Sequence, residues 1–366
     1  MEDSGIHIVI LSSRLDLPGG IERSVVNTAN LFQKKGHRVS LLVLDDTLES
    51  FYPIHEGVHK HLLPVSFGIT STGNPVSRKI RLLSDVLKLR RTLKQLHPTL
   101  VIATEYPFAA ALVLTGIRKK CKLVSWEHHH MNELEKNLFW ERVFRYTYPR
   151  LHQIVCLNPN EETLYKSLNE NVVVIPNYAE PTTGVSDSLP PLILTVSRLN
   201  HVKGIDILIP LAKKLLQKNP GWKWKVIGHG RMDDTYEEDI LNAGLADRLL
   251  IQAPTGHDLT SEYTRASLYV MTSRNECFPM TLLEAMSHGL PCVAFDCETG
   301  PRHIIREGYN GHLVANGDAD AMSGVIEGLL NDPVKRKAMG ENAVKSMNEF
   351  SEEKIYRLWE RSVLSP

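Results

Sequence analysis

The chain has 366 residues, of which 42% are hydrophobic, enough to fill the cores of two domains of ordinary size. Because Lys and Arg together number 42 and Asp and Glu also number 42, the protein has no bulk positive field, which argues against a nucleic-acid partner. No segment reaches the ~20 apolar residues of a membrane-spanning helix, and the five cysteines form no CxxC pair typical of zinc sites, so a reducing cytoplasm is the expected location.

Apolar runs alternate with helical periodicity in the first half of the chain and predict a parallel α/β domain. The expected strands are His7–Ser12, Val39–Leu44, Leu100–Thr104, Leu123–Trp126, Ile154–Leu157 and Val172–Ile175. After the first strand, Gly19 and Gly20 precede a long helix, and glycine lets the backbone come close to a phosphate or a sugar. A simple turn between strand and helix is the alternative explanation of this pair.

Residues 75–98 form the concentrated basic segment of the chain, with seven Lys or Arg against one Asp between positions 78 and 94. Helical spacing predicts that one apolar face packs on the sheet through Leu82, Val86, Leu89, Leu93 and Leu96. Two interpretations of the cations remain open. They form an ordinary solvated face, or the basic helix over residues 77–96 binds an anionic membrane surface.

Three consecutive histidines, His128, His129 and His130, follow the expected strand that ends at Trp126. Ligands of α/β domains bind outside the carboxyl ends of the strands, so this run is a candidate binding segment. Neighbouring residues point in different directions and rarely share one ion, so the run does not predict a metal site.

Residues 178–191 (YAEPTTGVSDSLPP) are rich in Pro, Thr, Ser and Asp, a composition that marks a linker. The predicted first domain is therefore residues 1–177 and the second is residues 192–345, with a C-terminal helix over residues 346–366 returning toward the first domain. The second domain alternates strands and helices again. Its expected strands are Leu192–Val196, Lys223–Ile227, Leu249–Gln252, Leu268–Met271, Pro291–Phe295 and His312–Val314.

Two cations and a glycine turn follow the first strands of the second domain. Arg198 and Lys203 come directly after the first strand, where fixed positive charges suit a pyrophosphate; a pair of solvated loop cations is the alternative. Gly228 follows the next strand in a short Gly-His-Gly turn, which lacks the full GxGxxG dinucleotide fingerprint.

Glu276 and Glu284 lie eight residues apart in the segment RNECFPMTLLEAMSHGLPCVAFDC, residues 274–297. Pro279 can start a helix whose free N–H groups and positive dipole end suit an anion, and Glu284 then lies about one turn inside it. An ionised carboxylate at that place can accept hydrogen bonds from hydroxyl groups. The alternative makes Glu284 a helix-surface acid and Glu276 a partner of the helix dipole.

This segment resembles the E-x7-E signature of the retaining family 4 glycosyltransferases, and CETGPRHIIREGYNGHLV, residues 297–314, looks most like galactosyl and N-acetylgalactosaminyl transferases of bacterial polysaccharide assembly. The resemblance implies the GT-B fold, an α/β architecture of two doubly wound, Rossmann-like domains that face each other across a cleft. It implies a UDP-sugar donor as substrate, an acceptor bound by the first domain, and no metal or other cofactor.

The resemblance also implies roles for single residues. Arg198 and Lys203 bind the diphosphate, Glu276 contacts the donor sugar, and Glu284 accepts hydrogen bonds from the ribose. A histidine, best matched by His128, lies near the reacting carbon, with His129 and His130 as alternatives. The remaining expected nucleotide-sugar contacts are Gly19, Gly20, Gly228, Pro279, Met280, Thr281 and Leu282.

The predicted reaction moves a hexose, galactose or N-acetylgalactosamine, with retention of configuration from a UDP-sugar to a lipid-linked or growing glycan. The enzyme is expected in the cytoplasm, on the inner face of the cell membrane if the basic helix binds lipid. Alternatives are a UDP-sugar epimerase of the same fold and a non-catalytic nucleotide-sugar-binding subunit. Asp318 and Asp320 spell a DxD pair but precede a predicted helix, so we predict helix caps rather than metal ligands.

Overall fold

The computed structural model describes residues 5–365 except 45–46, 68–74, 135, 181, 183, 187 and 231–233. Contacts between residues divide the chain into two compact units. Unit 1 consists of Met1–Asn177 together with Ile355–Pro366, and unit 2 is Tyr178–Lys354. The segment that the composition marks as a linker belongs to unit 2, where Ser186 donates its backbone N–H to the carbonyl of His288 at 2.8 Å. Three of the residues in that segment, 181, 183 and 187, lie outside the described residues.

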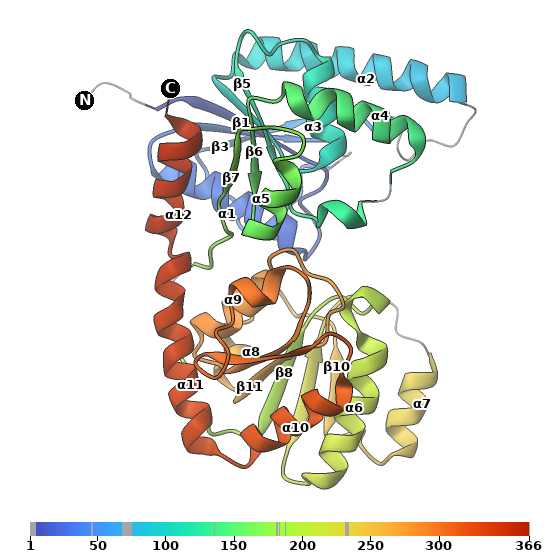
Figure 1. The fold of residues 1–366 in the computed structure, drawn as a ribbon, viewed down its shortest axis with the longest axis vertical. Helices are drawn as coiled ribbons and strands as arrows, with labels where there is room; N and C mark the ends of the chain where they lie inside the picture. Colours follow the sequence, from blue (N-terminus) through green and yellow to red (C-terminus); the bar gives the residue numbers. More distant parts are fainter. Residues whose placement is uncertain are drawn as a thin grey trace. The chain divides into compact units, whose positions relative to one another are not determined.

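Unit 1 contains a parallel sheet of seven strands in the order β3-β2-β1-β4-β5-β6-β7 (Figure 1). The strands are β1 (His7–Ser12), β2 (Arg38–Val43), β3 (Val58–Leu62), β4 (Leu100–Ala103), β5 (Lys122–Trp126), β6 (Gln153–Cys156) and β7 (Val172–Val174). Six of them coincide within one residue with apolar runs. The sequence does not predict β3, because its VHKHL pattern leaves three of five residues exposed at the sheet edge.

Helices cover both faces of this sheet. They are α1 (Gly20–Lys34), α2 (Pro75–Leu96), α3 (Tyr106–Leu114), α4 (Leu138–Thr147), α5 (Pro159–Tyr165) and the end of α12 (Glu352–Trp359). The predicted apolar face of α2 packs in the core with α3 and α4 on one side of the sheet. On the other side, Trp359 of α12 packs edge-on against Phe32 of α1 and Trp126 of β5, with ring centroids 5.4 and 5.3 Å apart.

Unit 2 contains a parallel sheet of six strands in the order β10-β9-β8-β11-β12-β13. The strands are β8 (Leu192–Val196), β9 (Lys223–Ile227), β10 (Leu249–Gln252), β11 (Leu268–Met271), β12 (Cys292–Asp296) and β13 (Gly311–Ala315). The helices are α6 (Ile205–Lys218), α7 (Asp234–Asn242), α8 (Thr260–Thr264), α9 (Met280–Ser287), α10 (Ala319–Leu330) and α11 (Pro333–Ser346). The predicted strands all appear, and four have the predicted bounds.

Each sheet has a point at which the order of its strands reverses. In unit 1 the chain builds β1, β2 and β3 toward one edge and β4 to β7 toward the other, so the reversal lies between β1 and β4. In unit 2 it lies between β8 and β11. The loops that leave the carboxyl ends of two such strands diverge, and ligands of doubly wound proteins bind in the crevice they leave. A ligand is therefore expected at these two switch points.

Candidate functional site

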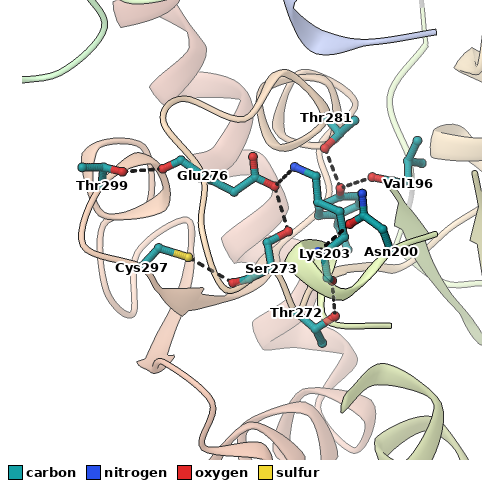
Figure 2. Close-up of polar contacts among 10 residues, drawn as sticks. Val196, Asn200, Lys203, Thr272, Ser273, Glu276, Thr281, Cys297 and Thr299 are labelled. Atoms are coloured by element: carbon teal, nitrogen blue, oxygen red, sulfur yellow. Dashed lines mark hydrogen bonds and ion pairs between the residues drawn. The ribbon is translucent and has the colours of Figure 1, made fainter. Parts of the chain in front are cut away.

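The switch point of unit 2 brings together two predicted site residues, Lys203 from the β8 loop and Glu276 from the β11 loop (Figure 2). Lys203 Nζ lies 2.5 Å from Glu276 Oε1, and their side chains are 15% and 12% exposed. The same carboxylate oxygen accepts a hydrogen bond from Ser273 Oγ at 2.7 Å. The opposite charges neutralise each other, which permits both to be largely removed from water.

The local sequence explains how the β8 loop reaches the β11 loop. Asn200 caps the short turn His201–Lys203, and its side chain accepts the N–H of Lys203 at 3.1 Å. Gly204 follows with φ +68°, and a Cβ there would lie 2.0 Å from the carbonyl oxygen of Thr272. Thr272 donates its hydroxyl to the carbonyls of Lys203 and Gly204 at 3.1 and 3.2 Å. Only glycine permits this close contact between the two loops.

Arg198, the other predicted cation, has a different environment. It is exposed on the β8 loop, and its guanidinium has no hydrogen bond or ion pair within the described part of the chain. A free guanidinium next to a strand end can present two parallel N–H groups to a phosphate. The two predicted cations are therefore not equivalent, since Lys203 is paired and Arg198 is open.

Glu284 lies inside α9, as predicted, but it is not a helix-surface acid. The residue is 5% exposed, and its Oε2 accepts a hydrogen bond from the hydroxyl of Tyr263 at 2.9 Å. Tyr263 belongs to α8 and stacks on His288 with ring centroids 5.0 Å apart. No motif marks Tyr263, because it belongs to a short helix and lies 21 residues from Glu284 in the sequence. Its hydroxyl fixes the carboxylate on the inner side of α9.

The start of α9 lies where the sequence predicts it. Pro279 is the N-cap, and Met280 and Thr281 are the first helical residues, whose N–H groups have no intrahelical acceptor. Thr281 Oγ1 lies 2.9 Å from the hydroxyl of Tyr269, which fixes the first turn. Leu282 is fully buried, and its N–H is bonded to the carbonyl of Pro279 at 3.2 Å, so its side chain packs in the core.

The glycine turns have local structural explanations. A Cβ on Gly228 would lie 1.8 Å from the carbonyl oxygen of Ser197, so this glycine lets the β8 and β9 loops touch. Gly19 is the extended N-cap of α1 and Gly20 its first residue, and a Cβ on Gly19 would meet only the flexible side chain of Glu22. The Gly228 turn is required by packing, whereas the Gly19–Gly20 turn leaves open backbone at the start of α1.

The three histidines of unit 1 have three environments. His128 is 7% exposed, and the centroid of its ring lies 4.3 Å from that of the Trp126 ring. Its Nε2 has no hydrogen-bond partner among the described residues. Burial, with a smaller contribution from His129, lowers the pKa of His128 to about 3, so the ring is neutral. His129 is exposed, and His130 is hydrogen-bonded through Nδ1 to the buried carboxylate of Glu161. Of the three, His128 offers a buried and open ring nitrogen.

A buried carboxylate anchors the chain just before these histidines. Glu127 is 1% exposed and accepts hydrogen bonds from the hydroxyls of Ser125, Tyr148 and Tyr165. Burial raises the pKa of Glu127, and the three donors counteract that rise. No sequence pattern predicts this cluster, because its donors come from three separate segments of the chain.

Asp318 and Asp320, the two acids of the DxD pair, each have a partner within unit 2. Asp318 caps α10 and accepts the N–H of Ala321 at 2.9 Å, which confirms the predicted cap. Asp320 lies in the first turn and pairs with Lys214 at 2.7 Å. Over the described ranges no group of three or more His, Cys, Asp or Glu residues is arranged to hold a metal ion.

Comparison with known proteins gives matches along nearly the whole chain. The model for glycosyl transferases group 1 matches residues 180–346, and the model for glycosyltransferase family 4 matches residues 18–182. The chain belongs to these glycosyltransferases. Its two parallel sheets with their surrounding helices are those of the GT-B fold. In the part of this glycosyltransferase that the structure describes, no helix is both long and apolar enough to cross a bilayer.

Three similar proteins cover both units of this glycosyltransferase. The amylovoran biosynthesis glycosyltransferase AmsD of Erwinia amylovora is 25% identical, with 96% of this chain and 98% of AmsD aligned. A Campylobacter jejuni N-acetylgalactosaminyltransferase, named for a diNAcBac-PP-undecaprenol-linked acceptor, is 24% identical over 93% of this chain and 94% of its own. The crystal structure of Anabaena HepE in complex with UDP superposes with a TM-score of 0.80 at 19% identity, covering 99% of this chain and 100% of HepE.

Proposed function

We propose that this glycosyltransferase moves a hexose, galactose or N-acetylgalactosamine, from a UDP-sugar to a lipid-linked or growing glycan in bacterial polysaccharide synthesis, with retention of configuration. The observation that carries the proposal is the Lys203–Glu276 pair at the switch point of unit 2, with the open guanidinium of Arg198 on the same β8 loop as Lys203. The UDP in the HepE structure and the names of the Erwinia and Campylobacter relatives support the choice of donor and acceptor.

The nucleotide part of the donor is assigned to α9 and its surroundings. Glu284 accepts the ribose hydroxyls, and the hydroxyl of Tyr263 keeps its carboxylate in place. The diphosphate lies against Arg198, Lys203 and the N–H groups of Met280 and Thr281 at the positive end of the helix dipole. Glu276 then accepts a hydroxyl of the donor sugar while it remains paired with Lys203.

The chemistry of the proposed transfer needs charge stabilisation more than acid or base groups. The bond from the anomeric carbon to the diphosphate oxygen breaks as the acceptor oxygen bonds to the same face, and the acceptor proton passes to the departing phosphate oxygen. Arg198 and Lys203 stabilise the negative charge that grows on the diphosphate, an effect larger in the transition state than in the ground state. These cations supply the charge for which other transferases use a divalent ion.

His128 is assigned to bind a hydroxyl of the donor sugar near the reacting carbon. Its ring is neutral and Nε2 is unpartnered among the described residues, so a hydroxyl can complete its hydrogen bonding. Because the pKa is about 3, His128 does not serve as a general acid at neutral pH.

Nucleotide release from UDP-, GDP- and ADP-sugars, with lipid-linked acceptor present or absent, tests the proposed function. We expect acceptor-stimulated release from one UDP-sugar in the wild type and its loss in Glu284→Ala. Release or isomerisation without acceptor would instead support the epimerase. If no donor turns over while UDP still raises the melting temperature of the wild type and not of Glu284→Ala, the chain is a binding subunit.

We also propose that α2 holds the enzyme on an anionic membrane surface. One stripe of α2 exposes Ile80, Leu83 and Leu87, with side chains 66%, 62% and 44% exposed, and continues into exposed Arg91 and Lys94. An apolar stripe followed by cations on one helix face suits the boundary between lipid tails and anionic headgroups.

Vesicle sedimentation tests this surface with anionic and neutral vesicles. Leu83→Ser together with Lys94→Gln is expected to reduce sedimentation with anionic vesicles at least several-fold, because both the apolar and the electrostatic contribution are lost. Arg90 is a poor choice for this test, since its guanidinium donates to the carbonyl of Thr115 at 2.9 Å and supports the end of α3. Sedimentation equal to wild type would refute membrane binding by α2.

A further inference from the structure

Unit 1 contains a cavity of about 1180 Å³ at its own switch point. Ser13 and Arg14 line it from the loop after β1, Glu105 from the loop after β4 and Tyr106 from the start of α3, and residues 64–66 and one stripe of α2 line it as well. Ligand pockets of proteins commonly measure about 300–1,000 Å³, so this cavity has room for more than one sugar ring. Nothing in the proposed donor site uses it.

The carboxyl group of Glu105 lines the cavity and forms no ion pair with a cation among the described residues. Glu105 accepts a hydrogen bond from Ser13 Oγ at 3.1 Å. Although Glu105 is the N-cap residue of α3, its side chain does not cap that helix. Burial raises its pKa to about 7, and the carboxylates of Glu22 and Glu127 add to the rise. The group can therefore accept or donate a hydrogen bond at neutral pH, which suits sugar hydroxyls.

The α2 wall carries positive charge. Arg81 and Lys88 lie seven residues apart on one exposed stripe, with Ser84 between them. Arg81 has no partner in the described part of the chain, and Lys88 lies 3.8 Å from Asp85. The carboxylate of Asp85 is already committed, since it accepts the N–H groups of Ser66 and Phe67 at 3.1 and 3.0 Å.

Arg14, from the loop after β1, adds little net positive charge to the cavity. Both oxygens of Asp16 bind its guanidinium, at 2.9 and 2.6 Å, so its charge is largely neutralised. The uncompensated positive charge of the cavity therefore lies on α2 rather than on the loop that carries Arg14.

We propose that this cavity binds the acceptor of the transfer reaction as an anionic saccharide, with sugar hydroxyls on Ser13 and Glu105 and a phosphate or carboxylate group against Arg81 and Lys88. The assignment rests on the proposed function, because it names the acceptor class of the same enzyme. A neutral sugar would leave Arg81 without a partner, whereas an anion next to the sugar ring uses both sides of the cavity.

Calorimetric titration of the full chain, with UDP present, tests the proposal through binding rather than turnover. The probes are N-acetylgalactosamine, its 1-phosphate, galacturonic acid and inorganic phosphate. We expect the sugar 1-phosphate or the uronic acid to bind at least about tenfold more tightly than the neutral sugar, the ratio expected of one charge-assisted hydrogen bond. Preference for the 1-phosphate assigns a phosphate group to the α2 wall, and preference for galacturonic acid assigns a carboxylate.

Variants on one helix supply a matched control. Arg81→Gln is expected to remove the preference for the anionic sugar, whereas Lys79→Gln, at an exposed α2 residue that does not line the cavity, leaves it unchanged. Equal loss in both variants, equal binding of neutral and anionic sugars, or equal binding of inorganic phosphate and sugar phosphate would each overturn the proposal.

The same titrations separate this inference from the proposed function. Titration with UDP alone reports the donor site, and Glu284→Ala is expected to weaken it without changing binding of the anionic sugar. Loss of UDP binding in the wild type would contradict the proposed function, and loss of the anionic preference with UDP binding intact would contradict only the acceptor assignment.

Discussion

The two switch points have the same strand topology, but each surrounds its carboxyl group with different neighbours. In unit 2, the mostly buried carboxylate of Glu276 is paired with Lys203 and accepts a hydrogen bond from Ser273. In unit 1, Glu105 has a similar position after β4, but among the described residues its carboxyl group is bonded to the hydroxyl of Ser13 and to no cation. Burial without a cation raises the pKa of Glu105 to about 7. The neighbouring residue, rather than the fold, sets the electrostatic environment of such a carboxyl group.

Arg198→Ala tests the charged switch point most directly. We expect kcat to fall on the order of 10²–10³, because the variant lacks a preorganised charge that stabilises the leaving diphosphate. The melting temperature should stay unchanged, since the guanidinium has no partner among the described residues. Lys337→Ala, another exposed cation of unit 2, is the control. An unchanged kcat in Arg198→Ala would remove this residue from the site.

A double-mutant cycle separates the contributions of the Lys203–Glu276 pair to stability and to activity. Lys203→Met leaves Glu276 mostly buried without its cation and is expected to lower the free energy of unfolding by about 3 kcal/mol. Adding Glu276→Gln should restore most of the stability but none of the transferase activity. Denaturant unfolding and initial rates measured on the same samples decide the outcome. Recovery of both stability and activity would make the pair purely structural.

Glu105→Gln tests the uncharged switch point through pH. The pKa of Glu105 in the folded state, about 7, is above the ordinary value of 4.5, so the folded protein binds more protons between these values. Stability of the wild type should therefore fall as pH rises from about 4.5 to 7. Because the residue is partly exposed, we expect a loss of about 1–2 kcal/mol. The variant should lack this loss, as measured by urea unfolding at pH 5 and pH 8.

The chain order of the strands could be predicted because parallel strands buried on both faces are continuous apolar runs. The strand β3 could not, since an edge strand exposes part of its backbone and tolerates polar residues. Sequence alone also selected Lys203 and Glu276 but not their contact, which joins residues 73 positions apart.

Residues whose role depends on packing were missed. Glu105 carried a usable signal, because it follows the predicted strand Leu100–Thr104 and polar residues at such strand ends commonly bind ligands. Tyr263 and Glu127 carried none, since their hydrogen-bond partners come from other elements and appear only once the chain has folded. The sequence favoured His128 through the family resemblance alone, with His129 and His130 as alternatives, and burial and hydrogen bonding give the three different environments.

The return of the chain to unit 1 affects how the protein is made. Trp359 packs on Phe32 and Trp126, and the carbonyl of Val363 accepts a hydrogen bond from Lys122 at 2.8 Å. On the ribosome, Trp359 and Val363 emerge only after the whole of unit 2 has been translated. Unit 2 is continuous in sequence and can fold first, although domains usually fold from the N-terminus onward. Truncation before Trp359 would therefore expose Trp126, against which the ring of His128 lies, and damage the half of the protein that was synthesised first.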